Sequence, residues 1–94
     1  MRTLFSIVKN IMTKISIVIL SYNTKEYLIK ALKSVALVAE KDWEIIVVDN
    51  ASTDGSPEIV KHKFPSVTLI RNKNNLGFAG GNNKGIEYSL KNGA

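Results

Sequence analysis

The fold is decided by residues 44–55, which read Glu44-Ile-Ile-Val-Val-Asp49-Asn-Ala-Ser-Thr-Asp-Gly55. Four consecutive β-branched residues precede Asp49, with no alternation of apolar and polar side chains. A strand of this kind is typical of a parallel sheet that is covered on both faces. The polar run that begins at Asp49 predicts a loop at the carboxyl end of the strand.

The same unit of apolar strand, polar loop and helix is repeated on both sides of this stretch. Upstream, a strand over 15–20 leads through Ser21-Tyr22-Asn23-Thr24 into a helical pattern over 25–38, with Asn23 as its expected cap. Downstream, Ser56 as N-cap and Pro57 after it predict a short helix, which Phe64-Pro65 ends. A third strand over 67–71 and an asparagine-rich loop then lead to a last helix over 80–91.

Strands that alternate with helices in this way predict an α/β fold, here a Rossmann-like three-layer sandwich with about three parallel strands. We place the domain at residues 14–94. Residues 1–13 form a leader for which we predict poor order, and a short amphipathic helix packed on the sheet edge is the alternative.

Composition limits the classes of function. The chain has 94 residues and no cysteine, which excludes disulfides and thiolate metal sites. The net charge is +5, but residues 1–14 contribute +3 of it and the remaining 80 residues only +2. This weak basic balance argues against nucleic acid as a partner. No apolar run approaches the roughly 20 residues of a membrane helix, so we expect a soluble, cytoplasmic protein without a transmembrane segment.

The candidate ligand site lies where the three loops meet, since parallel α/β sheets bind ligands beyond the carboxyl ends of their strands. Tyr22 offers a ring face on which a base can stack. Asp49 can accept hydrogen bonds from a base or a ribose. The pair Gly80-Gly81, at the expected start of the last helix, would let a phosphate approach backbone amides at the positive end of the helix dipole.

Each of these residues also has a purely structural interpretation. Asp49 is a common type of loop or cap residue, and Tyr22 is a common type of half-buried loop aromatic. Gly77, Gly80 and Gly81 could serve positive φ angles or close packing. Only the placement of all of them at one sheet edge favours a ligand site. The glycine patterns of dinucleotide-binding folds and of P-loops are absent, and no nucleophile is paired with a base.

Three segments together (Ile15 to Asn23, Val47 to Ser56 and Asn75 to Asn83) resemble the start of a family 2 glycosyltransferase. The resemblance covers about residues 14–94, and the third segment is similar to the rhamnosyltransferase-like branch of cell-surface polysaccharide synthesis. It implies a GT-A fold and a nucleoside-diphosphate sugar as ligand. The nucleotide-binding residues it implies are Leu20, Tyr22, Asn23, Asp49, Asn50, Gly77, Gly80, Gly81 and Asn82.

The sequence departs from the family pattern in two ways. Many members have arginine where this chain has Asn82, which removes a charge-assisted phosphate contact. Family members also continue into an aspartate-rich motif for a divalent metal, Mg or Mn, and into a catalytic carboxylate. We therefore expect no catalytic residue, no metal ligand and no resident cofactor in this chain, and no activity from it alone.

The resemblance also implies a role for the leader. In the family's sheet, the strand that matches residues 15–20 has a further strand, the one that ends in the metal motif, on its outer side. Without that strand, the edge of residues 15–20 would be exposed and prone to pairing with other chains. A third hypothesis is therefore that residues 4–8 cover this edge.

The leading hypothesis is thus the nucleotide-sugar-binding portion of a glycosyltransferase that transfers sugar from a nucleoside-diphosphate donor to a hydroxyl acceptor. A second polypeptide would then supply the remaining half, and the complete enzyme would be cytoplasmic or peripheral at the inner membrane face. The alternatives are a non-catalytic nucleotide-binding or interaction module and a degenerate gene fragment. The sequence does not specify the sugar, the base or the acceptor.

Overall fold

The chain forms one sheet with helices on both faces. The computed structural model describes residues 4–9, 15–40 and 42–91. Its elements, in chain order, are β1 (Leu4–Lys9), β2 (Ile15–Ser21), α1 (Lys25–Val38), β3 (Trp43–Asp49), α2 (Ser56–Lys63), β4 (Thr68–Arg71) and α3 (Gly77–Lys91).

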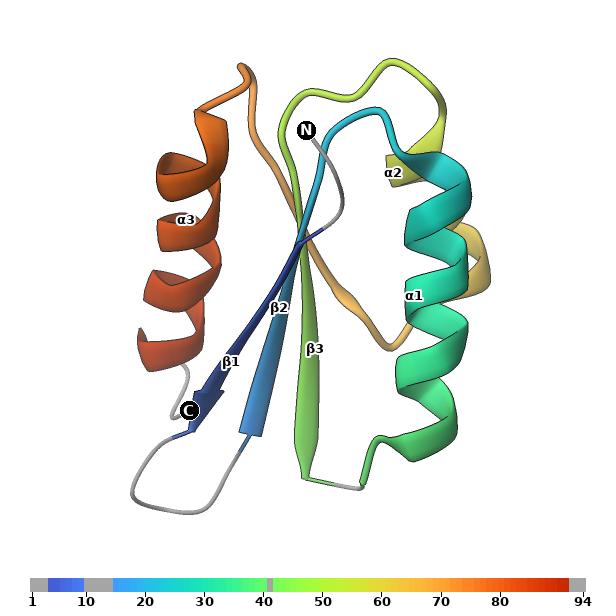
Figure 1. The fold of residues 1–94 in the computed structure, drawn as a ribbon, viewed down its shortest axis with the longest axis vertical. Helices are drawn as coiled ribbons and strands as arrows, with labels where there is room; N and C mark the ends of the chain where they lie inside the picture. The colour runs from blue at the N-terminus through green and yellow to red at the C-terminus, as the bar shows by residue number, and fades with distance from the viewer. Residues whose placement is uncertain (1–3, 10–14, 41, 92–94) are drawn as a thin grey trace.

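The strands follow one another across the sheet in the order β1-β2-β3-β4. β2, β3 and β4 are parallel, which confirms the predicted α/β fold with three parallel strands. The register places Ser21 beside Asp49 and Asp49 beside Arg71. The carboxyl ends of all three strands therefore lie along one edge of the sheet, at the top of Figure 1.

β1 runs antiparallel to β2, from Leu4 opposite Leu20 to Lys9 opposite Ile15. Residues 4–9 are thus a strand, where the sequence predicted a poorly ordered leader or a helix. The hypothesis that residues 4–8 cover the edge of β2 is confirmed by this pairing. The physical reason is that β2 would otherwise present a row of unpaired backbone groups at the sheet edge. Residues 1–3 and 10–14 of the leader lie outside the described residues.

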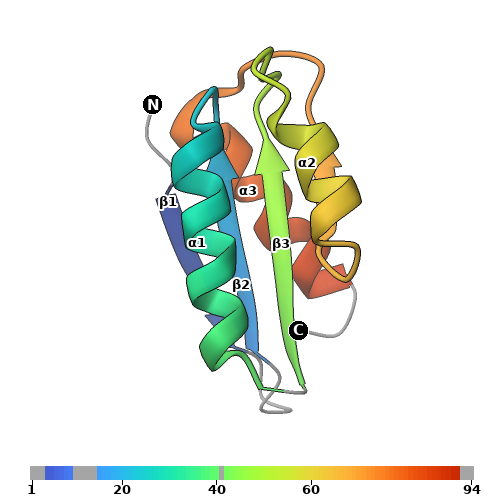
Figure 2. The ribbon, with the colours of Figure 1, turned by 90° about the vertical axis from the view of Figure 1, so that its right-hand side faces the viewer.

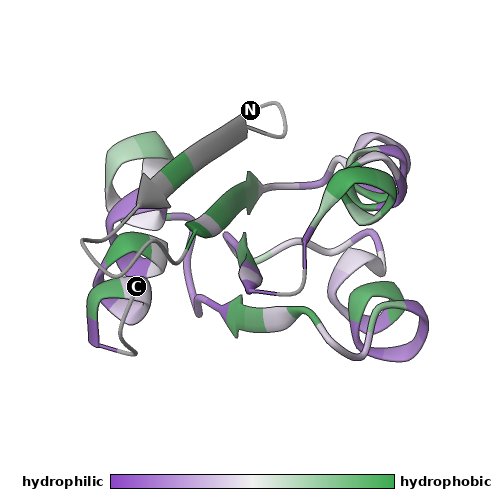
Figure 3. Cartoon of the chain, turned by 90° about the horizontal axis from the view of Figure 1, so that it is seen from below, coloured by the Kyte–Doolittle hydropathy of each residue, from purple (hydrophilic) through white to green (hydrophobic). Residues whose placement is uncertain are grey.

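α1 and α2 cover one face of the sheet and α3 covers the other (Figures 1 and 2). Because side chains alternate along a strand, β2, β3 and β4 each contribute side chains to two hydrophobic cores, one on each face of the sheet. Ile17, Ile19 and Val47 pack with residues of α1 and α2, and Val18, Leu20, Ile46 and Val48 form the core on the side of α3. Figure 3 shows mostly hydrophobic strands between the two helix layers.

Small residues bring α3 close to the sheet. Gly81, Gly85 and Ser89 are the buried residues of this helix, and their spacing of four places them on one face. A Cβ atom on Gly85 would collide with the side chain of Val18, and one on Gly81 would lie 2.5 Å from Leu20 Cδ1. These two glycines therefore serve close packing of the helix on β2.

Candidate functional site

Three loops meet at the carboxyl edge of the sheet: residues 22–24, 50–55 and 72–76 (Figure 1). Two backbone hydrogen bonds continue the strand pairing into these loops. The Asn50 N–H donates to the Ser21 carbonyl at 2.9 Å, and the Asn72 N–H donates to the Asp49 carbonyl at 2.8 Å. The predicted ligand loops are thus brought together and fixed at their bases.

Asp49 lies at the end of β3, and its side chain is almost completely buried. Its Oδ2 accepts a hydrogen bond from the Ser52 N–H at 2.8 Å. Among the described residues, the one hydrogen-bond partner of its Oδ1 is the Ser56 hydroxyl, at a long distance of 3.4 Å. The carboxylate therefore holds its own loop in shape, and its predicted role as an acceptor for a base or ribose stays a prediction.

Asn50 is fully buried and uses both atoms of its amide within the protein. Its Nδ2 donates to the Gly77 carbonyl at 3.1 Å, and its Oδ1 accepts from Asn72 Nδ2 at 2.8 Å. These bonds join the loop after β3 to the loop after β4 and to the start of α3. The geometry gives Asn50 a structural role beneath the loops.

Asn23 links the loop after β2 to the loop after β3. Its backbone N–H donates to Ser52 Oγ at 2.9 Å, and its Oδ1 accepts from the Thr53 N–H at 2.8 Å. The prediction that Asn23 caps α1 is wrong, because the N-cap is Thr24 and no side-chain cap bond is made there. Asn23 adopts a left-handed backbone with φ 50°, a conformation that asparagine tolerates, and this turns its side chain to the neighbouring loop.

Asp54, which the sequence analysis did not single out, connects the starts of two helices. Its Oδ2 accepts from the Lys25 N–H at 2.9 Å, at the first residue of α1. Its Oδ1 accepts from the Ser56 N–H at 3.0 Å and from the Ser56 hydroxyl at 2.7 Å, at the first residue of α2. The prediction that Ser56 is the N-cap of α2 is wrong, because Gly55 takes that position and Ser56 is the first residue of the helix.

These bonds change the ionisation of Asp54. Burial raises the pKa of its carboxyl, but the hydrogen bonds from Ser56 and Lys25 stabilise the charged form more strongly, so the pKa lies below its ordinary value. An aspartate two residues before a helix start is a recognisable signal for the local bond to Ser56. The bond to Lys25 spans 29 residues and leaves no local signal in the sequence.

α3 begins at Gly77, three residues before the predicted start at Gly80. Gly77 has φ +73°, and its N–H donates to Asn75 Oδ1 at 2.8 Å. The prediction that Gly80-Gly81 opens the helix is therefore wrong, because the amides left without a helical partner at this end belong to residues 76–79. Gly80 lies within the first turn, and Gly81 faces Leu20 and Asn50.

The nine predicted site residues divide into a buried floor and an accessible rim. The floor consists of Leu20, Asp49, Asn50 and Gly81. The rim consists of Tyr22, Asn23, Gly77, Gly80 and Asn82, each half-buried or exposed. A ligand at this edge would meet the rim residues first, together with the amides at the start of α3.

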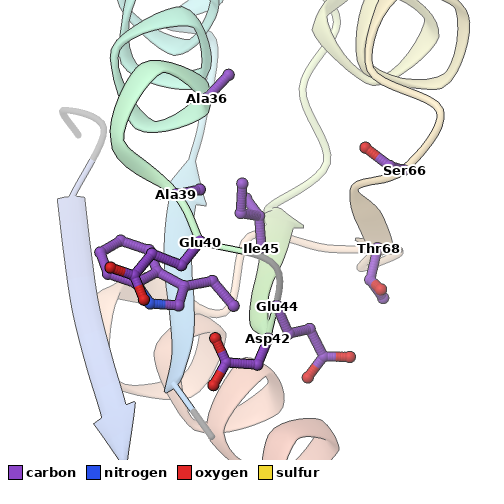
Figure 4. Close-up of a pocket in the computed structure, with 9 residues that line it drawn as sticks. Ala36, Ala39, Glu40, Asp42, Glu44, Ile45, Ser66 and Thr68 are labelled. Atoms are coloured by element: carbon purple, nitrogen blue, oxygen red, sulfur yellow. The ribbon is translucent and has the colours of Figure 1, made fainter.

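A hollow of about 530 Å³ lies at the opposite edge, beside the end of α1 and the starts of β3 and β4 (Figure 4). The carboxylates of Glu40, Asp42 and Glu44 line it. Like charges repel, so a diphosphate would not be held there. A smaller hollow of about 300 Å³ lies at the start of α1, beside Asn23 and Asp54.

Comparison with known proteins decides the family. The model of glycosyl transferase family 2 matches residues 16–92, which is most of the chain. The chain belongs to glycosyl transferase family 2. The matched segment runs from β2 into the end of α3 and contains every residue of the predicted site, whereas β1 precedes it.

Relatives of this family 2 chain support the same assignment. It is 32% identical over 80 residues to a Bacillus subtilis protein provisionally named glycosyltransferase EpsE. This match covers 81% of the present chain and 29% of the relative. The chain is 31% identical over 70 residues to a Mycobacterium tuberculosis N-acetylglucosaminyl-diphospho-decaprenol L-rhamnosyltransferase, covering 74% and 23%. A third relative from Bacillus subtilis, provisionally named as the teichuronic acid biosynthesis glycosyltransferase TuaG, is 32% identical over 76 residues, covering 78% and 30%.

The glycosyltransferase chain spans less than a third of the length of these relatives. No solved structure matches it. Among residues 4–9, 15–40 and 42–91, no three histidine, aspartate or glutamate side chains are grouped closely enough to hold a metal ion. Within the same residues, no helix is long and apolar enough to cross a membrane.

Proposed function

We propose that this chain binds the nucleoside-diphosphate part of a nucleotide-sugar donor at the carboxyl edge of its sheet. The observation that carries the proposal is the convergence of three loops of a family 2 glycosyltransferase at one edge. Tyr22 offers a half-buried ring for the base at that edge. The start of α3 offers backbone amides and the positive end of a helix dipole for the diphosphate.

We further propose that the complete enzyme transfers a sugar from this donor to a hydroxyl acceptor during synthesis of a cell-surface polysaccharide. Support comes from relatives whose names refer to rhamnosyl transfer and to teichuronic acid biosynthesis, and we propose rhamnose or another hexose as the sugar. A divalent metal, Mg or Mn, belongs to the family expectation, but the described residues do not offer a ligand set for it. We therefore assign this chain to donor binding and derive no chemical step from its residues.

Calorimetric titration with UDP, dTDP and GDP tests the proposed function. We expect saturable binding of at least one nucleotide, and substitution Asn82→Arg to tighten it. A new charge-assisted hydrogen bond to the diphosphate at an accessible site is worth about 1 kcal/mol, which corresponds to roughly fivefold in Kd. The nucleosides uridine, thymidine and guanosine should show no such gain, because they carry no phosphate.

Asn83→Arg is the matched control, since Asn83 is the exposed neighbour of Asn82 on α3. It adds the same charge at a different angle around the helix, so it should change Kd by less than twofold. Equal gains from both arginines would show a general charge effect and count against a diphosphate held at the start of α3. Absence of binding for all three nucleotides would contradict the proposed function.

A further inference from the structure

We propose that Asp54 is a positioning residue that holds the loop after β3 against the start of α1 and so fixes the shape of the nucleotide-binding edge. This inference rests on the proposed function of that edge. Asp54 is one carboxylate with two oxygens, and each oxygen serves the first residue of a different helix, Lys25 of α1 and Ser56 of α2.

The chemistry of the two helix starts suits a carboxylate. The first amides of a helix have no partner within the helix, and the helix dipole places partial positive charge there. One negative group satisfies both starts and ties them together. Lys25 belongs to the unit of β2 and α1, and Ser56 belongs to the unit of β3 and α2. The hydrogen bonds of Asp54 therefore join two units whose covalent connection runs through β3.

The hydrogen bonds of Asn23 form the contact between the loop after β2 and the loop after β3, which Asp54 supports. Asn23 makes two hydrogen bonds to the loop after β3, one with Ser52 and one with Thr53, and both are exposed to solvent. Water competes with exposed hydrogen bonds, so these two contribute little on their own. The carboxylate of Asp54 lies beside them and makes the charge-assisted, partly buried bonds of the same junction.

The backbone at this junction also needs to be held. Asn23 and Ala51 are the two residues of the described chain that combine a side chain with positive φ, 50° and 66°. Such conformations persist only where the surrounding structure enforces them. Both lie in the loops that Asp54 joins, and Tyr22 of the rim is the neighbour of Asn23. Loss of the Asp54 bonds would therefore let the predicted base-stacking ring shift.

Asp54→Asn separates the local bond from the long-range bond. Asparagine keeps one acceptor oxygen, which can still make the turn to Ser56, but its NH2 group cannot accept from the Lys25 N–H. We expect Kd for the bound nucleotide to rise at least fivefold at 10 °C, with an unchanged circular dichroism spectrum. Amide hydrogen exchange should become faster at Lys25 and Asn23, and unchanged in the middle of α1.

Val35→Ala is the control for general destabilisation, because Val35 is a buried core residue near the other end of α1. It should lower the melting temperature but leave Kd within twofold of the wild type. If Asp54→Asn binds as tightly as the wild type, or if both variants lose affinity equally, Asp54 is not a positioning residue. If the wild type itself binds no nucleotide, the proposed function is wrong and this inference is wrong with it. That outcome differs from one in which the wild type binds and Asp54→Asn binds equally well, which contradicts the inference alone.

Discussion

Single residues of α3 set the distance between this helix and the sheet, and Gly81→Ala tests this. Alanine is about 1 kcal/mol better than glycine within a helix. Overpacking costs about 1–3 kcal/mol, and the new Cβ would lie 2.5 Å from Leu20 Cδ1 and 2.7 Å from Asn50 Nδ2. We expect the collision to dominate and the free energy of unfolding in urea to fall by about 1 kcal/mol. Asn83→Ala, on the exposed side, should be neutral, and a stabilised Gly81→Ala would contradict the packing described here.

Ser89 lies on the same face of α3 as Gly81, but its substitution by alanine should stabilise the protein. Its side chain is fully buried, and its hydroxyl has no hydrogen-bond partner among the residues that the structure describes. A buried polar group without a partner costs about 1–3 kcal/mol. Ser89→Ala should therefore raise the free energy of unfolding by about 1 kcal/mol, while Ser34→Ala on the exposed side of α1 should change it little. A destabilised Ser89→Ala would indicate that the hydroxyl is satisfied.

Asp54 gives the protein a defined pH response. Its pKa in the folded state is lowered, so the folded state favours the charged form more than the unfolded chain does. Its contribution to stability is then fully present above the ordinary carboxyl pKa of about 4, and is lost as the pH falls through the lowered pKa of the folded state. The stability difference between the wild type and Asp54→Asn should therefore shrink below about pH 4 in urea titrations. A stability difference that stays constant down to pH 2 would contradict this role.

At the scale of elements, β1 protects the edge of β2. Six residue pairs join the two strands, although β1 lies outside the segment that matches the family. Removal of residues 1–13 should expose the β2 backbone and lead to self-association. We expect light scattering to detect oligomers or aggregates of the shortened chain, whereas removal of residues 1–3 alone should leave a monomer. A shortened chain that stays monomeric with unchanged stability would show that β1 contributes nothing.

Within residues 15–91, local patterns predicted every strand and helix, and the main error was the start of α3. The unbroken β-branched run before Asp49 was enough to predict a buried parallel strand, and Pro57 and Phe64-Pro65 were enough to bound α2. The start of α3 was missed because Gly77 allows the chain to enter the helix through a positive φ, while Gly80 and Gly81 then fit inside it.

The position of the candidate site was predictable from the sequence, but the hydrogen bonds that hold its loops together were not. Parallel strands guarantee that the three loops meet at one edge, so Tyr22, Asn23 and Asp49 were brought together as expected. No local pattern indicated that the Asn50 amide would bond to Gly77 and Asn72, or that Asp54 would accept from Lys25, because these partners lie 22 to 29 residues away. Such bonds depend on the packed fold and have no local pattern.

At the scale of the whole molecule, the two ends of the sheet differ in chemistry. The carboxyl edge carries amide side chains, a tyrosine and the start of α3, whereas the opposite edge carries the hollow lined by Glu40, Asp42 and Glu44. The larger hollow is thus the less suitable place for an anionic ligand. We therefore expect the nucleotide to bind at the carboxyl edge, although the hollow beside Asn23 and Asp54 there is the smaller of the two.

A residue-resolved amide NMR titration of the full chain with UDP, dTDP and GDP would show at which edge the nucleotide binds. We predict that the nucleotide that binds shifts the amide signals of Tyr22, Asn23 and residues 77–82. Signals of residues 40–45 and of Ser66 should stay in place. Shifts confined to the acidic hollow, or no shift with any of the three nucleotides, would contradict the account.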